Sequence, residues 1–283
     1  MLTRMERRPL ILSASRRTDL PGFHPERLVE RIRTRVQGVR SCSLYGVVFW
    51  TKHPAPLVHH RELRMLLEEL ANPVLQLTVT GLGGSRWEPH VPRSAEVLPL
   101  LGELVSGPLH GQPARLRWRF DPIWPRSTLR DEFCRLADAF ARLGVPTCTF
   151  SFPTSFCQLG SMEPVYRRVG LRFPGRAERA EILGWLCAEA SARSLRLLSC
   201  SQPENLLGPV EEAQCIPREV LEGLHPAGLP FPQGRDPSQR KACRCLVSED
   251  IGRYAEDPCG SGCSYCYSRA GGELGRERYA PRG

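Results

Sequence analysis

Short apolar runs alternate with amphipathic stretches along the first two thirds of the chain. The runs are continuously apolar, with no polar residue at every second position, a pattern typical of strands whose two faces are both covered. Six such strands are expected, at Leu10–Ser15, Gly46–Thr51, Val74–Thr80, Ala114–Phe120, Thr147–Phe152 and Leu195–Cys200.

Leucine and phenylalanine recur at helical spacing between these strands. The spacing predicts helices at Pro25–Arg35, His59–Leu70, Arg93–Val105, Leu129–Leu143 and Ala177–Arg193. Regular strand–helix alternation implies parallel strands joined by crossover helices. No G-x-G-x-x-G follows the first strand, which disfavours a dinucleotide-binding sheet. We therefore predict an α/β fold, a partial TIM-like barrel of about six parallel strands with outer helices.

Polar side chains follow every predicted strand. In a parallel barrel the carboxyl ends of the strands share one face, where active sites are built. The candidates on that face are Arg16, Arg17, Asp19, Lys52, Thr80, Arg119, Asp121, Ser151 and Cys200.

Composition narrows the functional classes. The chain has 283 residues, is 41% hydrophobic and 24% charged, and carries a net charge of +9. That charge permits nucleic-acid binding, but no basic run is interleaved with aromatic residues. The N-terminus shows no apolar signal segment, and no apolar run is long enough to span a membrane, so we expect a cytoplasmic protein. In that compartment twelve cysteines favour metal or redox chemistry over disulfides.

Three cysteines lie close together near the C-terminus. Cys259, Cys263 and Cys266 are spaced C-x3-C-x2-C among glycine and serine residues. Such a loop can hold a 4Fe–4S cluster through three thiolates, leaving the fourth iron open to an exogenous ligand. Clustered cysteines are also common zinc ligands, so zinc remains an alternative.

Residues 201–258 are rich in proline, glycine and charged residues, and we expect a bound metal to hold this segment together. The candidate ligands of this second centre are Cys200, Cys215, Cys243 and Cys245. An iron–sulfur cluster and a structural zinc both fit. Cys243 or Cys245 could instead supply a fourth ligand to the C-terminal cluster and close it. The expected organisation is a barrel at 9–200, a cysteine-rich iron–sulfur segment at 201–268 packed on its catalytic face, and a disordered tail at 269–283.

The spacing of the C-terminal cysteines, with Tyr265 just before the last one, resembles the signature of radical S-adenosylmethionine (SAM) enzymes. In those enzymes the motif normally lies near the N-terminus, whereas here it comes last. The resemblance implies that SAM binds the open iron and that an electron from the cluster cleaves it to a 5′-deoxyadenosyl radical.

The chain as a whole resembles an uncharacterised bacterial family, domain of unknown function 1848. The matching segments run from Pro9 to Ser268. They are Ser13–Asp19, Val48–Pro54, Gln76–Gly81, Trp118–Pro122, Cys243–Cys245, Asp250–Gly252 and the three-cysteine motif. The family is noted for a C-terminal cysteine cluster similar to that of radical SAM proteins, and it implies no substrate.

Together these patterns predict a radical SAM-like enzyme with an unknown substrate and an electron donor such as ferredoxin or flavodoxin. The side chains expected to hold SAM or an anionic substrate are Arg16, Arg17, Asp19, Lys52, Arg119 and Asp121, with Tyr265, Thr80 and Ser151 beside the cofactor. One alternative is a zinc or closed-cluster protein whose barrel is a binding module. Another is a nucleic-acid-modifying or DNA-repair enzyme that uses the same cluster.

Overall fold

Parallel strands form the centre of the molecule. The computed structural model describes residues 8–38, 42–153, 156–157, 160–202, 210–239, 241–253 and 255–266. Its main sheet has eight strands in the order β10-β1-β2-β3-β4-β5-β8-β9, and every neighbouring pair is parallel. The long strands are β1 (Arg8–Ala14), β2 (Cys42–Thr51), β3 (Pro73–Thr78), β4 (Leu116–Phe120), β5 (Thr147–Phe150) and β8 (Arg196–Ser199).

These are the six strands expected from the sequence, paired in chain order, and the α/β prediction is confirmed. Two short strands that the sequence did not predict extend the edges, β9 (Glu211–Glu212) beside β8 and β10 (Glu249–Asp250) beside β1. A separate antiparallel pair joins β6 (Phe156–Cys157) to β7 (Gly160–Ser161).

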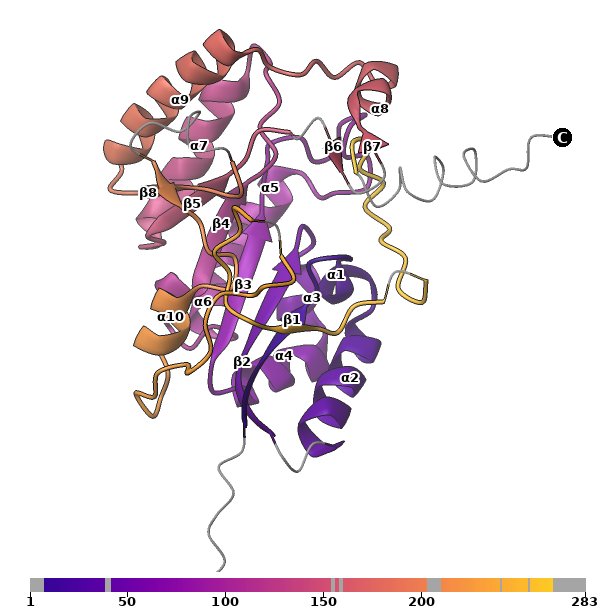
Figure 1. Ribbon diagram of the computed structural model, residues 1–283, viewed down its shortest axis with the longest axis vertical. Helices are drawn as coiled ribbons and strands as arrows, with labels where there is room; N and C mark the ends of the chain where they lie inside the picture. Colours follow the sequence, from indigo (N-terminus) through magenta and orange to yellow (C-terminus); the bar gives the residue numbers. More distant parts are fainter. Residues whose placement is uncertain are drawn as a thin grey trace, which may run out of the picture.

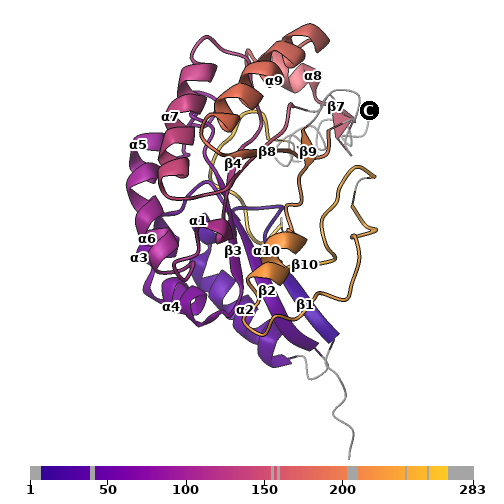
Figure 2. The same ribbon diagram turned by 90° about the vertical axis from the view of Figure 1, so that its left-hand side faces the viewer.

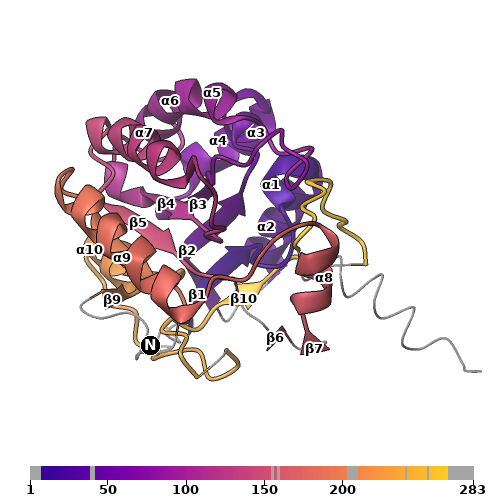
Figure 3. The ribbon, with the colours of Figure 1, turned by 90° about the horizontal axis from the view of Figure 1, so that it is seen from above.

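Helices cover the outer side of the curved sheet (Figures 2 and 3). The helices of the described residues are α1 (Leu20–Phe23), α2 (Pro25–Gly38), α3 (Ala55–His59), α4 (Arg61–Glu69), α5 (Ser94–Val97), η1 (Leu98–Leu100), α6 (Leu101–Ser106), η2 (Pro113–Arg115), α7 (Leu129–Arg142), α8 (Glu163–Arg168), α9 (Arg176–Ser191) and α10 (Arg218–Gly223). Of these, α10 packs on the opposite face of the sheet, and α8 packs beside the cysteine loop. No helix in the part of the chain that the structure describes has the length and apolar composition needed to cross a membrane.

The helix expected at His59–Leu70 is α4, which an unpredicted short helix, α3, precedes, and the helix expected at Arg93–Val105 is broken. His60 is extended, and its side chain accepts a hydrogen bond from the Leu63 amide, so α3 ends and α4 begins there. The helix expected at Arg93–Val105 is divided into α5, η1 and α6, with Pro99 inside the 3₁₀ turn. Proline lacks the amide that a continuous α-helix needs, which explains the division.

The main core lies between the sheet and the outer helices. Alternate residues of each strand, such as Val47 and Phe49 of β2, point into it. Trp118 of β4 is fully buried and stacks on Phe140 of α7, with ring centroids 4.8 Å apart. The tryptophan is therefore a core residue, as its place in a strand suggested.

The opposite face of the sheet is covered by the returning C-terminal segment (Figure 2). Ile11, Val48 and Val74 on the strands pack against apolar residues of that segment, Ile216, Leu221, Phe231 and Leu246. Both faces of the sheet are thus buried, as the continuous apolar runs predicted.

One carboxylate fixes the final pass of the chain along β1. Asp250 accepts hydrogen bonds from the hydroxyls of Ser13 at 2.9 Å and Ser15 at 2.6 Å. It also accepts from the backbone amides of Arg16 and Gly252, both at 2.9 Å. Four donors make Asp250 the point where β10 is held in register beside β1, immediately before the three-cysteine loop.

Gly252 gives a direct test of this contact. A Cβ at position 252 would lie 2.1 Å from the Ser15 hydroxyl oxygen, whereas one at Gly184 in α9 would meet nothing within 4 Å. We expect Gly252→Ala to lower the free energy of unfolding by about 1–3 kcal/mol through overpacking. Gly184→Ala should raise it by about 0.5–1 kcal/mol, because alanine favours the helix.

Denaturant unfolding of both variants beside the wild type measures the two changes. Equal effects at the two positions would show that the Asp250 turn is not packed as described.

Candidate functional site

The carboxyl ends of the parallel strands meet at one edge of the sheet, and the candidate site is built there. Lys52 follows β2, Thr80 follows β3, Asp121 follows β4 and Ser151 follows β5. The three-cysteine loop, Asp257 to Cys266, lies against the same edge through contacts with the segments after β1, β2 and β3.

A buried charge network joins the loop to the scaffold. The Lys52 ammonium donates to a carboxylate oxygen of Glu88 and, at 2.9 Å, to the Tyr265 hydroxyl. Tyr265 donates to the same oxygen of Glu88, and Thr80 donates to the other oxygen at 2.9 Å. Glu88 is only 1% exposed, so groups of the protein take the place of water as its hydrogen-bond donors.

Both partners of the ion pair are charged at neutral pH. Burial by itself would lower the pKa of Lys52, but Glu88 and the nearby Cys263 thiol outweigh burial and raise it. Burial would likewise raise the pKa of Glu88, yet Lys52 and the three hydrogen bonds leave it below its ordinary value. The edge of the sheet therefore holds a fixed cation beside the cysteine loop.

Backbone and side-chain contacts hold the loop along its length. The Thr18 hydroxyl donates to the Asp257 carbonyl at 2.7 Å, and the Ser264 amide donates to the Trp87 carbonyl at 2.9 Å. His53 lies 2.9 Å from the Ser261 hydroxyl.

The two glycines of the loop are needed for close packing. A Cβ on Gly260 would lie 2.5 Å from the Phe23 ring, and one on Gly262 would lie 2.8 Å from His90. Gly262 also has a φ of +68°, a conformation that favours glycine.

The three cysteines of the loop differ in exposure. Cys259 is exposed, Cys266 is half-buried and Cys263 is buried at 7% exposure, within the electrostatic reach of both others and of Lys52. Burial raises the pKa of the Cys263 thiol to about 12, against the opposing effect of Lys52. Among the described residues, no group of three or more His, Cys, Asp or Glu side chains is already arranged around a metal position.

A second cluster of polar residues lies at the carboxyl ends of β4 and β5. Asp121 accepts from the Arg119 guanidinium and from the Ser151 hydroxyl. Arg119 also donates to the Cys215 sulfur at 2.8 Å. Burial acts against ionisation of Arg119, but Cys215 and Asp121 more than compensate, and the pKa of Arg119 is raised well above its ordinary value.

The four cysteines of the expected second centre lie together on the inner face of the sheet. The sulfurs of Cys200 and Cys215 are 3.6 Å apart. The Cys245 sulfur accepts hydrogen bonds from the backbone amides of Cys215 at 3.2 Å and Ile216 at 3.4 Å. The Cys243 thiol interacts with Cys245 through a hydrogen bond. Cys243 and Cys245 therefore contact the Cys200–Cys215 pair, while Cys263 interacts with Cys259 and Cys266.

The polar residues after β1 have separate surroundings. Asp19 caps α1 by accepting the Gly22 amide at 2.9 Å, and it also accepts the Lys52 amide at 2.8 Å. Burial raises the pKa of Asp19. Arg16 extends to the C-terminal segment, where it donates to Ser248 at 2.5 Å and lies 3.6 Å from Asp236. The Arg17 side chain is exposed.

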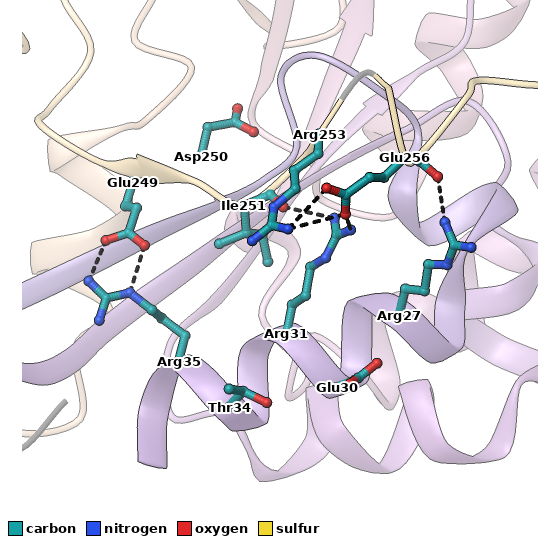
Figure 4. A pocket seen from close by; sticks show the side chains of 10 residues that line it. All are labelled: Arg27, Glu30, Arg31, Thr34, Arg35, Glu249, Asp250, Ile251, Arg253 and Glu256. Carbon is teal, nitrogen blue, oxygen red and sulfur yellow. Dashed lines mark hydrogen bonds and ion pairs between the residues drawn. The ribbon is translucent and has the colours of Figure 1, made fainter. Parts of the chain in front are cut away.

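A groove of about 790 Å³ lies elsewhere, on the outside between α2 and residues 249–256 (Figure 4). Its arginines are engaged with the C-terminal segment. Arg35 pairs with Glu249 through two bonds of 2.6 and 2.5 Å, and Arg31 pairs with Glu256 and with Asp257, whose side chain is fully buried. The groove therefore marks the ionic attachment of the segment that carries the cysteine loop.

Sequence comparison identifies the family. The chain matches the family described as "Domain of unknown function (DUF1848)" over residues 11–268. It belongs to that family. The DUF1848 match begins in β1 and ends just beyond the cysteine loop, so the Asp250 turn, the Lys52–Glu88 pair and both cysteine groups all lie within the family domain. None of the curated proteins matches the chain.

Two solved structures share a distant likeness with this DUF1848 chain. One is Streptococcus suis SuiB bound to S-adenosylmethionine, at 8% identity and a TM-score of 0.33, over 69% of this chain and 48% of that one. The other is the carboxyl transferase domain of Rhizobium etli pyruvate carboxylase, at 12% identity and a TM-score of 0.29, over 69% of this chain and 35% of that one. The chain thus spans about half the length of the first structure and about a third of the length of the second. With TM-scores this low, neither likeness supports a statement about function.

Sequence reasoning missed three carboxylates that build the site. Glu88, Asp250 and Asp257 each come from a segment with no helical or strand periodicity, and their partners are far away in the chain. The signal available for Asp250 was the similarity of Asp250–Gly252 to the family, which gave no partner. Glu88 stands in an ordinary-looking polar loop after β3, and its burial could not be inferred from its neighbours.

Breaking the buried ion pair should be costly. Lys52→Met or Glu88→Gln alone should each lower the free energy of unfolding by about 3–5 kcal/mol, because each leaves a buried group without its partner. The double variant should cost less than the sum. Arg64→Gln, in the exposed Arg64–Glu68 pair of α4, is the control and should cost less than about 0.5 kcal/mol.

The pair also sets a pH dependence. Because the pKa of Glu88 is lowered on folding, its stabilisation is complete above the ordinary value of 4.5 and is lost as the pH falls through the lower folded value. Urea unfolding from pH 7 to pH 3 should therefore give a smaller loss of stability in Glu88→Gln than in the wild type. For the unfolding free energies at neutral pH, a double variant whose loss equals the sum of the Lys52→Met and Glu88→Gln losses would contradict the coupling of these two side chains.

Proposed function

We propose that the chain is an iron–sulfur protein of the radical SAM type, with a 4Fe–4S cluster held by Cys259, Cys263 and Cys266. The main support for this proposal is that these three cysteines share one loop, whereas Cys243 and Cys245 lie beside Cys200 and Cys215. Three thiolates leave one iron of such a cluster without a protein ligand. When bound, the cluster supplies the electron for reductive cleavage of SAM.

The donor set and the backbone fit this group. Thiolates are the usual cluster ligands, and Gly260 and Gly262 keep the loop free of side chains where it turns. Closing the three thiols around one cluster requires their side chains to rotate, because they do not surround a common point as described.

Lys52 supplies positive charge where thiolates would gather. Its ammonium is held by Glu88, so it stays charged in a largely buried position. A fixed cation near Cys263 favours the deprotonated thiol that ligation needs. Tyr265 contributes by anchoring the end of the loop, since its hydroxyl bonds to both Lys52 and Glu88.

An apolar wall covers the part of the loop that contains Cys263 and Tyr265. Cys263 and Tyr265 pack with Trp124, Met162 and Tyr166, which come from the segment after β4 and from the region of α8. Exclusion of water protects reactive intermediates from side reactions.

Arg119 and Asp121 are the groups that we assign to polar recognition of the ligand or substrate. They lie at the end of β4, on the edge where the loop docks, and Ser151 fixes the carboxylate of Asp121. The Arg119 guanidinium is buried and already donates to Asp121 and Cys215, so binding a ligand carboxylate or phosphate there would require it to exchange one of these partners. Reduction of the cluster calls for an electron donor such as ferredoxin or flavodoxin.

Anaerobic EPR of the dithionite-reduced protein tests this function. The wild type should give a reduced-cluster signal that changes shape when SAM is added, because SAM would occupy the open iron. Cys263→Ala should lose the signal, and Cys187→Ala, which changes a partly buried cysteine of α9, should keep it.

A signal that is indifferent to SAM would mean a closed cluster, with the barrel as a binding module. A colourless protein with zinc bound in the loop would exclude the iron–sulfur assignment altogether.

A further inference from the structure

We propose a second metal centre, a mononuclear zinc bound by the thiolates of Cys200, Cys215, Cys243 and Cys245. It is separate from the three-cysteine loop and does not depend on the function proposed for that loop. The sequence left zinc and an iron–sulfur cluster equally open at these positions, and the structure offers a reason to choose between them.

Three separate parts of the chain bring these thiols together. Cys200 follows β8 at the carboxyl edge of the sheet, Cys215 follows β9, and Cys243 and Cys245 lie in the segment that covers the inner face. Cys215 and Cys245 are buried, and the other two are half-buried. Four thiols gathered from distant segments are unusual for simple core residues and typical of a metal site.

One sulfur–sulfur distance favours a single ion over a 4Fe–4S cluster. The Cys200 and Cys215 sulfurs lie 3.6 Å apart, and the Cys245 sulfur lies 3.2 Å from the Cys215 amide. A tetrahedral zinc with Zn–S bonds of about 2.3 Å places neighbouring sulfurs roughly 3.8 Å apart. In a 4Fe–4S cluster each thiolate binds a different iron, and the sulfurs are spread more widely. The spacing of the Cys200 and Cys215 sulfurs therefore matches two ligands of one ion.

Hydrogen-bond donors already surround these sulfurs. Two consecutive backbone amides, of Cys215 and Ile216, point to the Cys245 sulfur, and the Arg119 guanidinium points to the Cys215 sulfur. Such donors stabilise negative sulfur, and zinc with four thiolates carries a net charge of −2 that Arg119 partly offsets. The four side chains do not surround a common point among the described residues, so binding one ion requires them to rotate.

The segment that carries these residues explains the need for a metal. Between β9 and β10 the described chain has a single short helix, α10, and packs only a small apolar cluster on the sheet. A zinc would link the sheet edge to this segment and add stability that so small a core lacks. The zinc would also hold the Arg119 side chain in place, because Arg119 donates to Cys215 as well as to Asp121 at the carboxyl edge.

Metal analysis of the full chain, produced with zinc supplied, tests the site. We expect about one zinc per chain in the wild type. Cys243→Ser should lose most of it, and Cys243→His, which offers another zinc ligand at the same position, should regain it. Cys187→Ser and Cys263→Ala should both keep the zinc, which separates this centre from the loop. Cobalt(II) exchanged into the wild type should give sulfur-to-cobalt charge-transfer absorption that Cys243→Ser lacks.

Three results would overturn the assignment. Zinc lost in Cys263→Ala and kept in Cys243→Ser would place the ion in the loop. Iron and sulfide lost in Cys243→Ser would replace zinc by a cluster. A metal-free wild type with a Cys200–Cys215 disulfide would remove the metal. None of these depends on whether SAM binds, so the proposed function can fail while this inference stands.

Discussion

The buried pair of Lys52 and Glu88 is the interaction on which the arrangement of the candidate site depends. It joins the end of β2 to the loop after β3, and through the Tyr265 hydroxyl it also holds the C-terminal cysteine loop. A buried charge is tolerated only when it is paired and hydrogen-bonded, so none of these three groups can move independently. The loop is consequently positioned by electrostatics, at the edge where a parallel sheet gathers its functional groups.

Two further sets of contacts bring the loop to that edge. Asp250 fixes the chain beside β1 through four hydrogen-bond donors, and Arg35 and Arg31 of α2 bind Glu249 and Glu256 on either side of it (Figure 4). The C-terminal segment therefore continues the sheet as β10 before it crosses the strand ends, and Figure 1 shows this course along β1. A motif that comes last in the sequence is thereby placed next to the first strands.

The regular part of the fold could be predicted because its information is local. Continuous apolar runs gave the six long strands, and helical spacing gave most of the helices. The start of α4 after His60 and the break at Pro99 depended on single residues whose effect the spacing concealed. Strands of two residues, β9 and β10, have too little pattern to be visible at all. The expected tail at 269–283 lies outside the described residues.

The site was predictable in part. Polar residues at strand ends, such as Lys52 and Asp121, were found because parallel strands must bring their ends together. Glu88 and Asp250 were missed because their roles rest on contacts with distant segments, which no local pattern encodes. The sequence also suggested a group of three cysteines and a group of four, but only the contacts of Cys245 with the backbone of Cys215 and Ile216 associate it with the second group.

The measurement that tests this account most directly is a crystal structure of the anaerobically reconstituted protein, with anomalous scattering recorded at the iron edge. The account predicts one cluster on Cys259, Cys263 and Cys266, next to the Lys52–Glu88 pair, with one iron lacking a protein ligand. A fourth protein ligand on that cluster, or a loop found away from Lys52, would contradict it.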